Sequence, residues 1–126
     1  MIYRHYKGGL YYTIGYATRF SKEFPARGIE QAFSARYTEA ENEEQNEIIA
    51  VLSVIDEKTG SMYYAYDTNA INGLQTFYKD LDGNFWLRPL DMFNGVVKDG
   101  TTRRFTKVKG EELFDMIYDL KLATAK

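Results

Sequence analysis

The sequence predicts a mainly β protein of the α+β class, folded as a single domain over residues 1–126 with a helix near its C-terminal end. Aromatic residues make up 16% of the chain, including 11 Tyr and 8 Phe, and such side chains favour the half-buried surface of a pleated sheet. The run Ile48–Ile55 is apolar on both faces and rich in β-branched residues, as expected of a central strand. Glycine-containing turns separate the predicted strands.

The first predicted strand covers Leu10–Arg19, which is rich in Tyr, Ile and Thr. Gly8 and Gly9 precede it and indicate a tight turn or a bulge. Gly15 lies inside the strand, where a glycine is typical of a bend or of a close approach between backbones.

Residues 20–47 have a different composition and are predicted to form an insertion. Ile29, Ala32 and Phe33 recur at helical spacing, which predicts a helix within Gly28–Ala40. A run of glutamates without a basic residue follows, consisting of Glu39, Glu41, Glu43, Glu44 and Glu47. This run indicates a solvated loop or a frayed helix end, and a basic partner is the alternative interpretation.

A hairpin is predicted after the insertion, with Ile48–Ile55 as its first strand and Ser61–Thr68 as the returning one. Asp56–Gly60 forms the turn between them. Leu74–Lys79 predicts a further strand. The next five residues, Asp80–Asn84, resemble the start of a calcium loop, but that loop requires glycine at its sixth position, which is occupied here by Phe85. A β-turn is therefore predicted instead.

Near the C-terminal end, the Asp99-Gly100 pair predicts a hairpin between residues 96–98 and 101–108. A helix is predicted over residues 111–124. Its apolar stripe has the spacing i, i+3, i+4 and i+7 and consists of Leu113, Met116, Ile117 and Leu120. Such a helix packs on a sheet or on a second subunit, and we expect a homo-oligomer.

The segment Phe85–Phe93 contains the only tryptophan and one of two prolines. Because residues two apart on a strand share a face, Phe85 and Leu87 are predicted to point inward, with Trp86 and Arg88 together on the opposite face. Pro89 has no amide donor, so strand pairing should end there.

Three parts of the chain carry a resemblance: YRHYKGG at residues 3–9, FWLRPLDMF at residues 85–93 and RF at residues 104–105. Together they resemble a short, uncharacterised bacterial and phage domain with the pattern YRHYKG, LWVRPLxMF and RF. The resemblance covers about half of the chain and implies a small SH3-like antiparallel barrel without an established activity. Residues 20–55, residues 69–73 and the C-terminal helix depart from the pattern, which suggests an elaborated or oligomeric version.

The segments that carry the resemblance also supply cationic and aromatic side chains. Guanidinium groups bind phosphate, and an arginine plane with an aromatic face can enclose a base. The sequence therefore predicts a non-enzymatic protein that binds a phosphate-bearing, nucleotide-like ligand. Its role would suit a phage protein that sequesters a nucleotide-derived immune signal, either a cyclic ADP-ribose isomer or a cyclic oligonucleotide. The predicted ligand-binding residues are Arg4, Lys7, Trp86, Arg88, Phe93, Arg103, Arg104 and Phe105.

Two other functions remain open: an SH3-like adaptor that binds protein or single-stranded nucleic acid, and a small hydrolase-type enzyme that uses His5 with an aspartate. A structural role for His5, donating a hydrogen bond within the first turn, is the simpler interpretation. Aromatic residues of small barrels commonly form the core, so the binding residues also have a packing interpretation.

The composition sets further expectations. The chain has no cysteine and one histidine, so no disulfide, cofactor or metal site is expected. A formal charge of −2 disfavours general binding to nucleic acid but permits a local basic face. No apolar run is long enough for a bilayer, and we expect a cytoplasmic protein, in the host cytoplasm if it is phage-encoded.

Overall fold

The structure, a computed structural model, describes residues 1–20, 26–40, 43–96 and 100–110. The predicted C-terminal helix lies outside the described residues. The elements, in chain order, are β1 (Ile2–His5), β2 (Leu10–Arg19), β3 (Ala26–Tyr37), β4 (Glu47–Asp56), β5 (Met62–Tyr66), β6 (Gln75–Asp80), β7 (Phe85–Pro89), α1 (Leu90–Asn94) and β8 (Phe105–Lys107).

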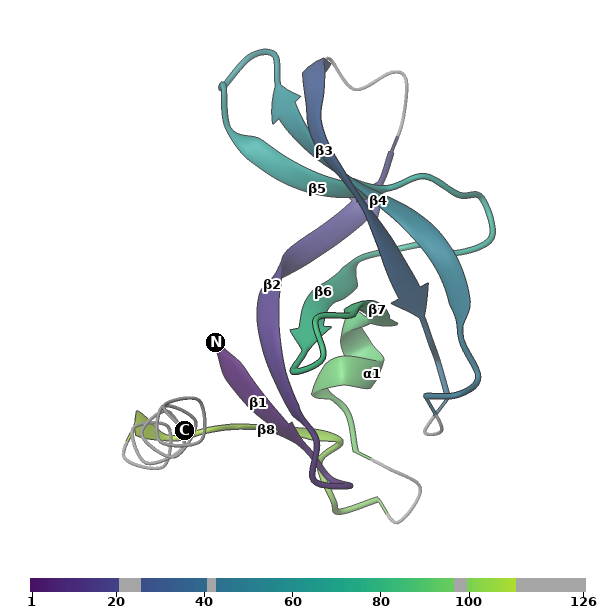
Figure 1. The fold of residues 1–126 in the computed structure, drawn as a ribbon, viewed down its shortest axis with the longest axis vertical. Coiled ribbons are helices and arrows are strands. Elements are labelled where there is room, and N and C mark those ends of the chain that lie inside the picture. Colours follow the sequence, from purple (N-terminus) through teal and green to yellow (C-terminus); the bar gives the residue numbers. More distant parts are fainter. Residues whose placement is uncertain (21–25, 41–42, 97–99, 111–126) are drawn as a thin grey trace, which may run out of the picture.

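The sheet closes into a six-stranded barrel (Figure 1), which confirms the predicted mainly β fold and small SH3-like barrel. Its strands follow the order β5-β4-β3-β7-β6-β2, and β2 then pairs with β5 to complete the ring. β1 and β8 continue the sheet beyond β2, outside the ring. The pairs β2–β5 and β3–β7 are parallel, whereas the other strand pairs are antiparallel.

The predicted helix within Gly28–Ala40 is wrong, because these residues contribute to strand β3. β3 pairs with β4 on one side and with β7 on the other. Phe33, Ala35 and Tyr37 follow the two-residue period of a strand and pack in the barrel core. Ile29, which contributed to the helical spacing, is 55% exposed. Pairing with two neighbouring strands therefore outweighs a short helical pattern.

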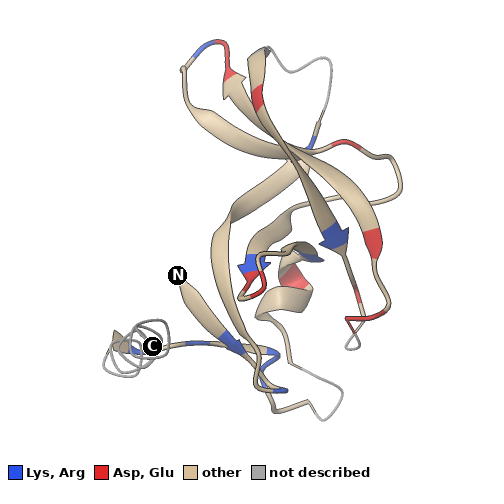
Figure 2. Ribbon diagram, viewed as in Figure 1, with Lys and Arg blue, Asp and Glu red and all other residues tan. Residues whose placement is uncertain are grey.

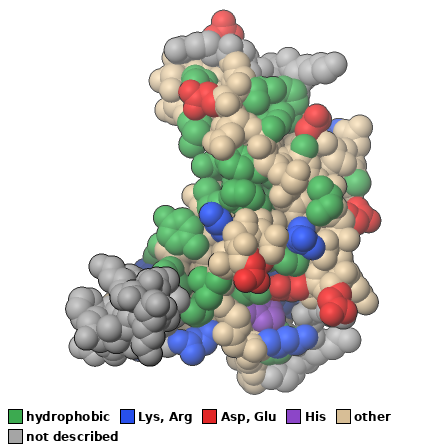
Figure 3. Space-filling model, in the orientation of Figure 1, with side chains coloured by type: hydrophobic (Ala, Val, Ile, Leu, Met, Phe, Trp, Pro, Cys, Tyr) green, Lys and Arg blue, Asp and Glu red, His purple; other side chains and the backbone are tan. Residues whose placement is uncertain are grey.

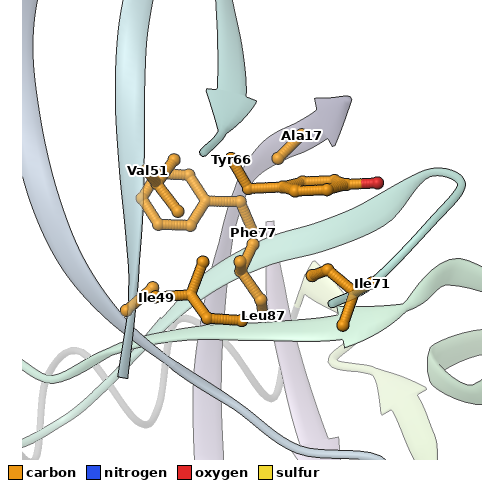
Figure 4. Packing of buried hydrophobic residues seen from close by; sticks show 8 residues of the cluster. Ala17, Ile49, Val51, Tyr66, Ile71, Phe77 and Leu87 are labelled. Carbon is orange, nitrogen blue, oxygen red and sulfur yellow. The ribbon is translucent and has the colours of Figure 1, made fainter. Parts of the chain in front are cut away.

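The barrel interior is a close-packed cluster of apolar side chains (Figure 4). Val51, Phe77 and Leu87 come from three different strands, and each is fully buried. Tyr66 lies among them, and its hydroxyl donates a hydrogen bond to the carbonyl oxygen of Gly73 at 2.7 Å. A buried phenol with a satisfied hydroxyl adds apolar area without an unpaired polar atom.

The other strand predictions agree with the structure in position. β2 has the predicted bounds, and the ends of β4, β5 and β6 fall within one or two residues of those predicted. A bulge between Thr13 and Gly15 accounts for the predicted bend in β2. The predicted strand at residues 101–108 is reduced to β8, preceded by an isolated bridge between Val96 and Arg103.

The turn at Asp80 is the predicted β-turn. The amide of Gly83 donates to the carbonyl oxygen of Asp80 at 3.2 Å, and Gly83 has a φ of 89°. A side-chain oxygen of Asp80 also accepts from the amide of Asn84 at 2.8 Å. In both bonds, a backbone amide of the turn donates to an oxygen of Asp80, as in other Asx turns.

Candidate functional site

The predicted division of β7 between two faces is confirmed. Phe85 and Leu87 belong to the barrel core, whereas Trp86 and Arg88 lie on the opposite side of the strand. Trp86 is part of a second aromatic cluster outside the ring. We call this cluster the second core, and it comprises Tyr3, Tyr11, Tyr78, Trp86, Phe93 and Phe105.

Arg88 is fully buried beside the second core. Its Nε donates to the Tyr78 hydroxyl at 3.3 Å, and its Nη1 donates to the carbonyl oxygen of Ala40 at 3.1 Å. Its Nη2 lies 3.8 Å from Oε1 of Glu43. Arg88 therefore attaches the acidic segment to the barrel. Glu43 therefore lies beside a basic side chain of its own chain, and a basic partner for the acidic run stays an alternative interpretation.

Tyr11 and Tyr78 complete this buried polar group. The Tyr11 hydroxyl donates to both carboxylate oxygens of Glu43, at 2.7 and 2.9 Å. Burial raises the pKa of Tyr11, and the bond to Glu43 raises it further. Burial also raises the pKa of Tyr78 to about 12, even though Arg88 opposes the shift. Both phenols therefore remain neutral near pH 7, and Tyr11 remains a hydrogen-bond donor.

Trp86 is 5% exposed, and its indole Nε1 donates to Oδ2 of Asp80 at 2.9 Å. Partial burial acts to raise the pKa of Asp80, but the hydrogen bonds from Trp86 and Asn84 outweigh it and hold this pKa below its usual value. The guanidinium carbon of Arg36 lies 5.9 Å from the centre of the indole ring. The contacts of Trp86 therefore lie within the protein.

The structure divides the eight predicted ligand-binding residues into two groups. Five are buried: Trp86, Arg88, Phe93, Arg104 and Phe105. Three are exposed: Arg4, Lys7 and Arg103. Arg104 is 6% exposed and donates from Nη1 to the carbonyl oxygen of Met92. Trp86 and Arg88 do share a face, but packed side chains cover it. The exposed group is therefore the part of the predicted site that solvent can reach, and the binding role of all eight stays a prediction.

The exposed group belongs to a basic end of the molecule (Figure 2). Residues 1–12 and 100–110 contain no aspartate or glutamate. Their strands β1, β2 and β8 are neighbours in the sheet. We call these two segments the basic end, and its cations are Arg4, Lys7, Arg103, Arg104, Lys107 and Lys109. Since the whole chain has a net charge of −2, the positive charge is segregated rather than general.

Two of the grooves on the described surface bear on the predicted site. The larger, of about 570 Å³, is next to the acidic segment, and Glu39 and Glu47 line it. The smaller, of about 370 Å³, lies between β2 and α1, and Tyr12, Tyr16 and Thr76 are among its lining residues. Neither has a Lys or Arg side chain among the described residues that line it. The smaller groove was not predicted from the sequence, although Gly15 indicates the bend in β2 beside which it forms.

His5 is 3% exposed and packs near the rings of Tyr6, Tyr11 and Phe105. Its Nδ1 accepts a hydrogen bond from the Lys7 amide at 3.2 Å. A hydrogen bond donated by His5 within the first turn was predicted; its backbone amide donates to the carbonyl oxygen of Gly9 at 2.8 Å, whereas its side-chain Nδ1 accepts the bond from Lys7. This bond requires Nδ1 to be unprotonated.

Comparisons with protein-family models, with curated proteins and with solved structures found no match. The resemblance to the bacterial and phage domain therefore stays a prediction. Among the described residues, no helix has the length and apolar character needed to cross a membrane. The same part of the chain has no group of three or more His, Cys, Asp or Glu side chains placed to hold a metal ion.

Proposed function

We propose that this protein is a non-enzymatic binding protein and that its basic end binds single-stranded nucleic acid. The observation that carries the proposal is the charge segregation: six cations and no carboxylate come from the two segments that build β1, the start of β2 and β8. Phosphate contacts dominate the affinity of proteins for nucleic acid, and they require positive charge at the surface. Arg4, Lys7 and Arg103 are exposed there.

Aromatic side chains accompany these cations. Lys7 lies over the ring of Tyr6, with Nζ 5.7 Å from the ring centre. Tyr12 is 54% exposed on β2, the strand next to β1. In the view of Figure 3, hydrophobic side chains form a band along the molecule, and basic as well as acidic side chains lie beside its lower half. Cations interleaved with exposed aromatic rings are typical of surfaces that bind single strands without strong sequence preference.

A strand of nucleic acid suits this surface better than a free nucleotide does. A free nucleotide has its phosphates at one end, and its usual site is a concave pocket with a few converging polar groups. The cations here come from three places: β1, the turn after it and residues 103–109. Capture of a free nucleotide, including a cyclic immune signal, is the second candidate because the same charges could hold one phosphate.

The test is fluorescence anisotropy with a labelled 20-mer of thymidine at several salt concentrations. We expect the affinity to fall steeply with salt, with a log–log slope of about −0.7 for each phosphate contact. The double variant Lys7→Gln/Arg103→Gln should bind more weakly and make this slope shallower by about 1.4, two contacts' worth. The matched control, Arg19→Gln/Lys58→Gln, also removes two positive charges but leaves the basic end intact, and it should bind like the wild type.

Salt-independent binding, or equal losses in the two double variants, would contradict the proposal. Thermal-shift measurements with nucleotides, cyclic ADP-ribose isomers and cyclic oligonucleotides address the second candidate, because a ligand of the folded state raises the melting temperature with its concentration. If one of these compounds raises the melting temperature and the 20-mer does not bind, the ligand is a free nucleotide and not single-stranded nucleic acid. No binding in either experiment would contradict both candidates, and Lys107 would then protect the edge strand β8 against aggregation.

A further inference from the structure

We infer that the groove between β2 and α1 is a binding site for one unstacked nucleobase. This inference rests on the proposed function and assigns a role to residues outside the predicted site. The groove has a volume of about 370 Å³, at the lower end of the range for small-molecule sites. The lining residues used in the argument are Tyr3, Tyr16, Thr76 and Asn94.

The bulge in β2 shapes this groove. The register of β2 against β6 shifts between Thr13 and Gly15, so β2 bends at this point. Beyond the bulge, Tyr16 is directly opposite Thr76 on β6 and shares its face of the sheet. Helix α1 forms the other wall, and the amide of Leu90 attaches its start to the carbonyl oxygen of Leu74 at 3.1 Å.

The floor and the walls differ in chemistry. Thr76 is 2% exposed, and its Oγ1 has no hydrogen-bond partner among the described residues. A buried hydroxyl without a partner is unfavourable, and a ligand with a polar edge would satisfy it. One wall is aromatic: Tyr16, on the same face of the sheet as Thr76, is 61% exposed. A nucleobase offers a partner for each of these groups. Its flat face can stack on the tyrosine ring, and its polar edge can hydrogen-bond with the hydroxyl.

Cations lie next to the groove. Nη1 of Arg103 donates to the carbonyl oxygen of Asn94, a lining residue, at 3.4 Å. Lys107 on β8 is directly opposite Tyr3 on β1, which is also a lining residue. Both cations are exposed, and no carboxylate is among the described residues that line the groove. A base in the groove would therefore place its flanking phosphates near positive charge, as a bound strand requires.

The first experiment compares two probes by anisotropy: the labelled 20-mer of thymidine and an abasic oligomer of equal length, which has the phosphates without the bases. We expect the wild type to bind the thymidine oligomer at least fivefold more tightly. In Tyr16→Leu this preference should disappear while the salt slope stays unchanged. Tyr63→Leu, at a tyrosine outside the groove, is the control and should retain the preference.

The second experiment uses Thr76→Val, which removes the hydroxyl at nearly constant volume. Because that hydroxyl has no partner among the described residues, the melting temperature should stay equal or rise, while the affinity for the thymidine oligomer falls about fivefold. A purely structural Thr76 would lose stability and keep its affinity, which would overturn the inference.

The two proposals fail in different ways. If the wild type binds both oligomers equally and with a steep salt dependence, the groove holds no base, and the proposed function stands. If it binds neither, both proposals are wrong.

Discussion

Arg88 and Glu43 are far apart in the sequence, yet Nη2 of Arg88 lies 3.8 Å from Oε1 of Glu43. Arg88 has no exposed surface, and the side chain of Glu43 is 25% exposed. Because Arg88 also donates to Tyr78 and to the carbonyl oxygen of Ala40, it joins the acidic segment to the outer face of the barrel. A buried cation is stable only while such partners remain in place.

Arg88→Ala should therefore destabilise the protein strongly. Loss of one partner from a buried charged network typically lowers the free energy of unfolding by about 3–5 kcal/mol. Urea denaturation monitored by the fluorescence of Trp86, the only tryptophan, measures this change. Arg88→Lys keeps the charge without the planar fork of donors, and its loss should be smaller. The control Arg103→Ala, at an exposed arginine, should change stability by no more than about 0.5 kcal/mol. Equal stability of Arg88→Ala and this control would contradict the buried role.

The bond between Tyr11 and Glu43 should be measurable as an energetic coupling. The Tyr11 hydroxyl lies 2.7 and 2.9 Å from the two carboxylate oxygens, and hydrogen bonds to charged groups contribute about 1.5–3 kcal/mol. A double-mutant cycle with Tyr11→Phe and Glu43→Ala should yield a coupling free energy of at least about 1 kcal/mol. A cycle with Tyr12→Phe in place of Tyr11→Phe is the control and should show none. Additive effects in the first cycle would mean that the bond is absent in solution.

Stability should fall at alkaline pH because of Tyr78. The pKa of this phenol is raised from 10.0 to about 12 by burial, so the folded state keeps a proton that the unfolded chain releases. Below pH 10 both states hold the proton, and no dependence arises from Tyr78. Between pH 10 and 12 the free energy of unfolding should fall by about 1.4 kcal/mol per pH unit for this group.

Tyr78→Phe should make this alkaline slope shallower, whereas Tyr12→Phe, at an exposed tyrosine, should leave it unchanged. Urea denaturation at half-unit steps from pH 9 to 12 measures both slopes. An unchanged slope in Tyr78→Phe would show that Tyr78 titrates at its ordinary pKa in the folded protein.

Two glycines should respond to alanine in opposite ways. A Cβ at Gly95 would lie 2.8 Å from the carbonyl oxygen of Asp91, which is fixed backbone in α1. Gly95→Ala should therefore lower the free energy of unfolding by about 1–3 kcal/mol. At Gly15, the nearest atoms belong to the ring of Tyr64 at 3.5 Å, an ordinary contact distance. Gly15→Ala should be neutral or should stabilise by about 0.4–1 kcal/mol through the unfolded chain. Melting temperatures compare the two, and a more stable Gly95→Ala would contradict the close approach.

Much of the barrel could be predicted because its signals are local. The alternation in β7 depends only on the two-residue period of a strand, so the separation of Leu87 from Arg88 was predictable. The turn at Gly83 follows from residue types within five positions. The apolar run of β4 predicted a central strand, and β4 does lie between β5 and β3, although Ile48 at its start is 63% exposed.

Contacts between distant segments were not predictable. β3 is a strand because β4 and β7 lie on either side of it, and a short helical spacing contains no information about those partners. The parallel pairing of β2 with β5 that closes the barrel leaves no periodic pattern in either strand. Arg88 could be recognised as a cation in an aromatic segment, but only the fold brings Glu43 to it. Thr76 and Tyr16 likewise face one groove only because the bulge in β2 sets their register. Side chains from separate strands are brought together by strand pairing, and their spacing along the chain does not reveal it.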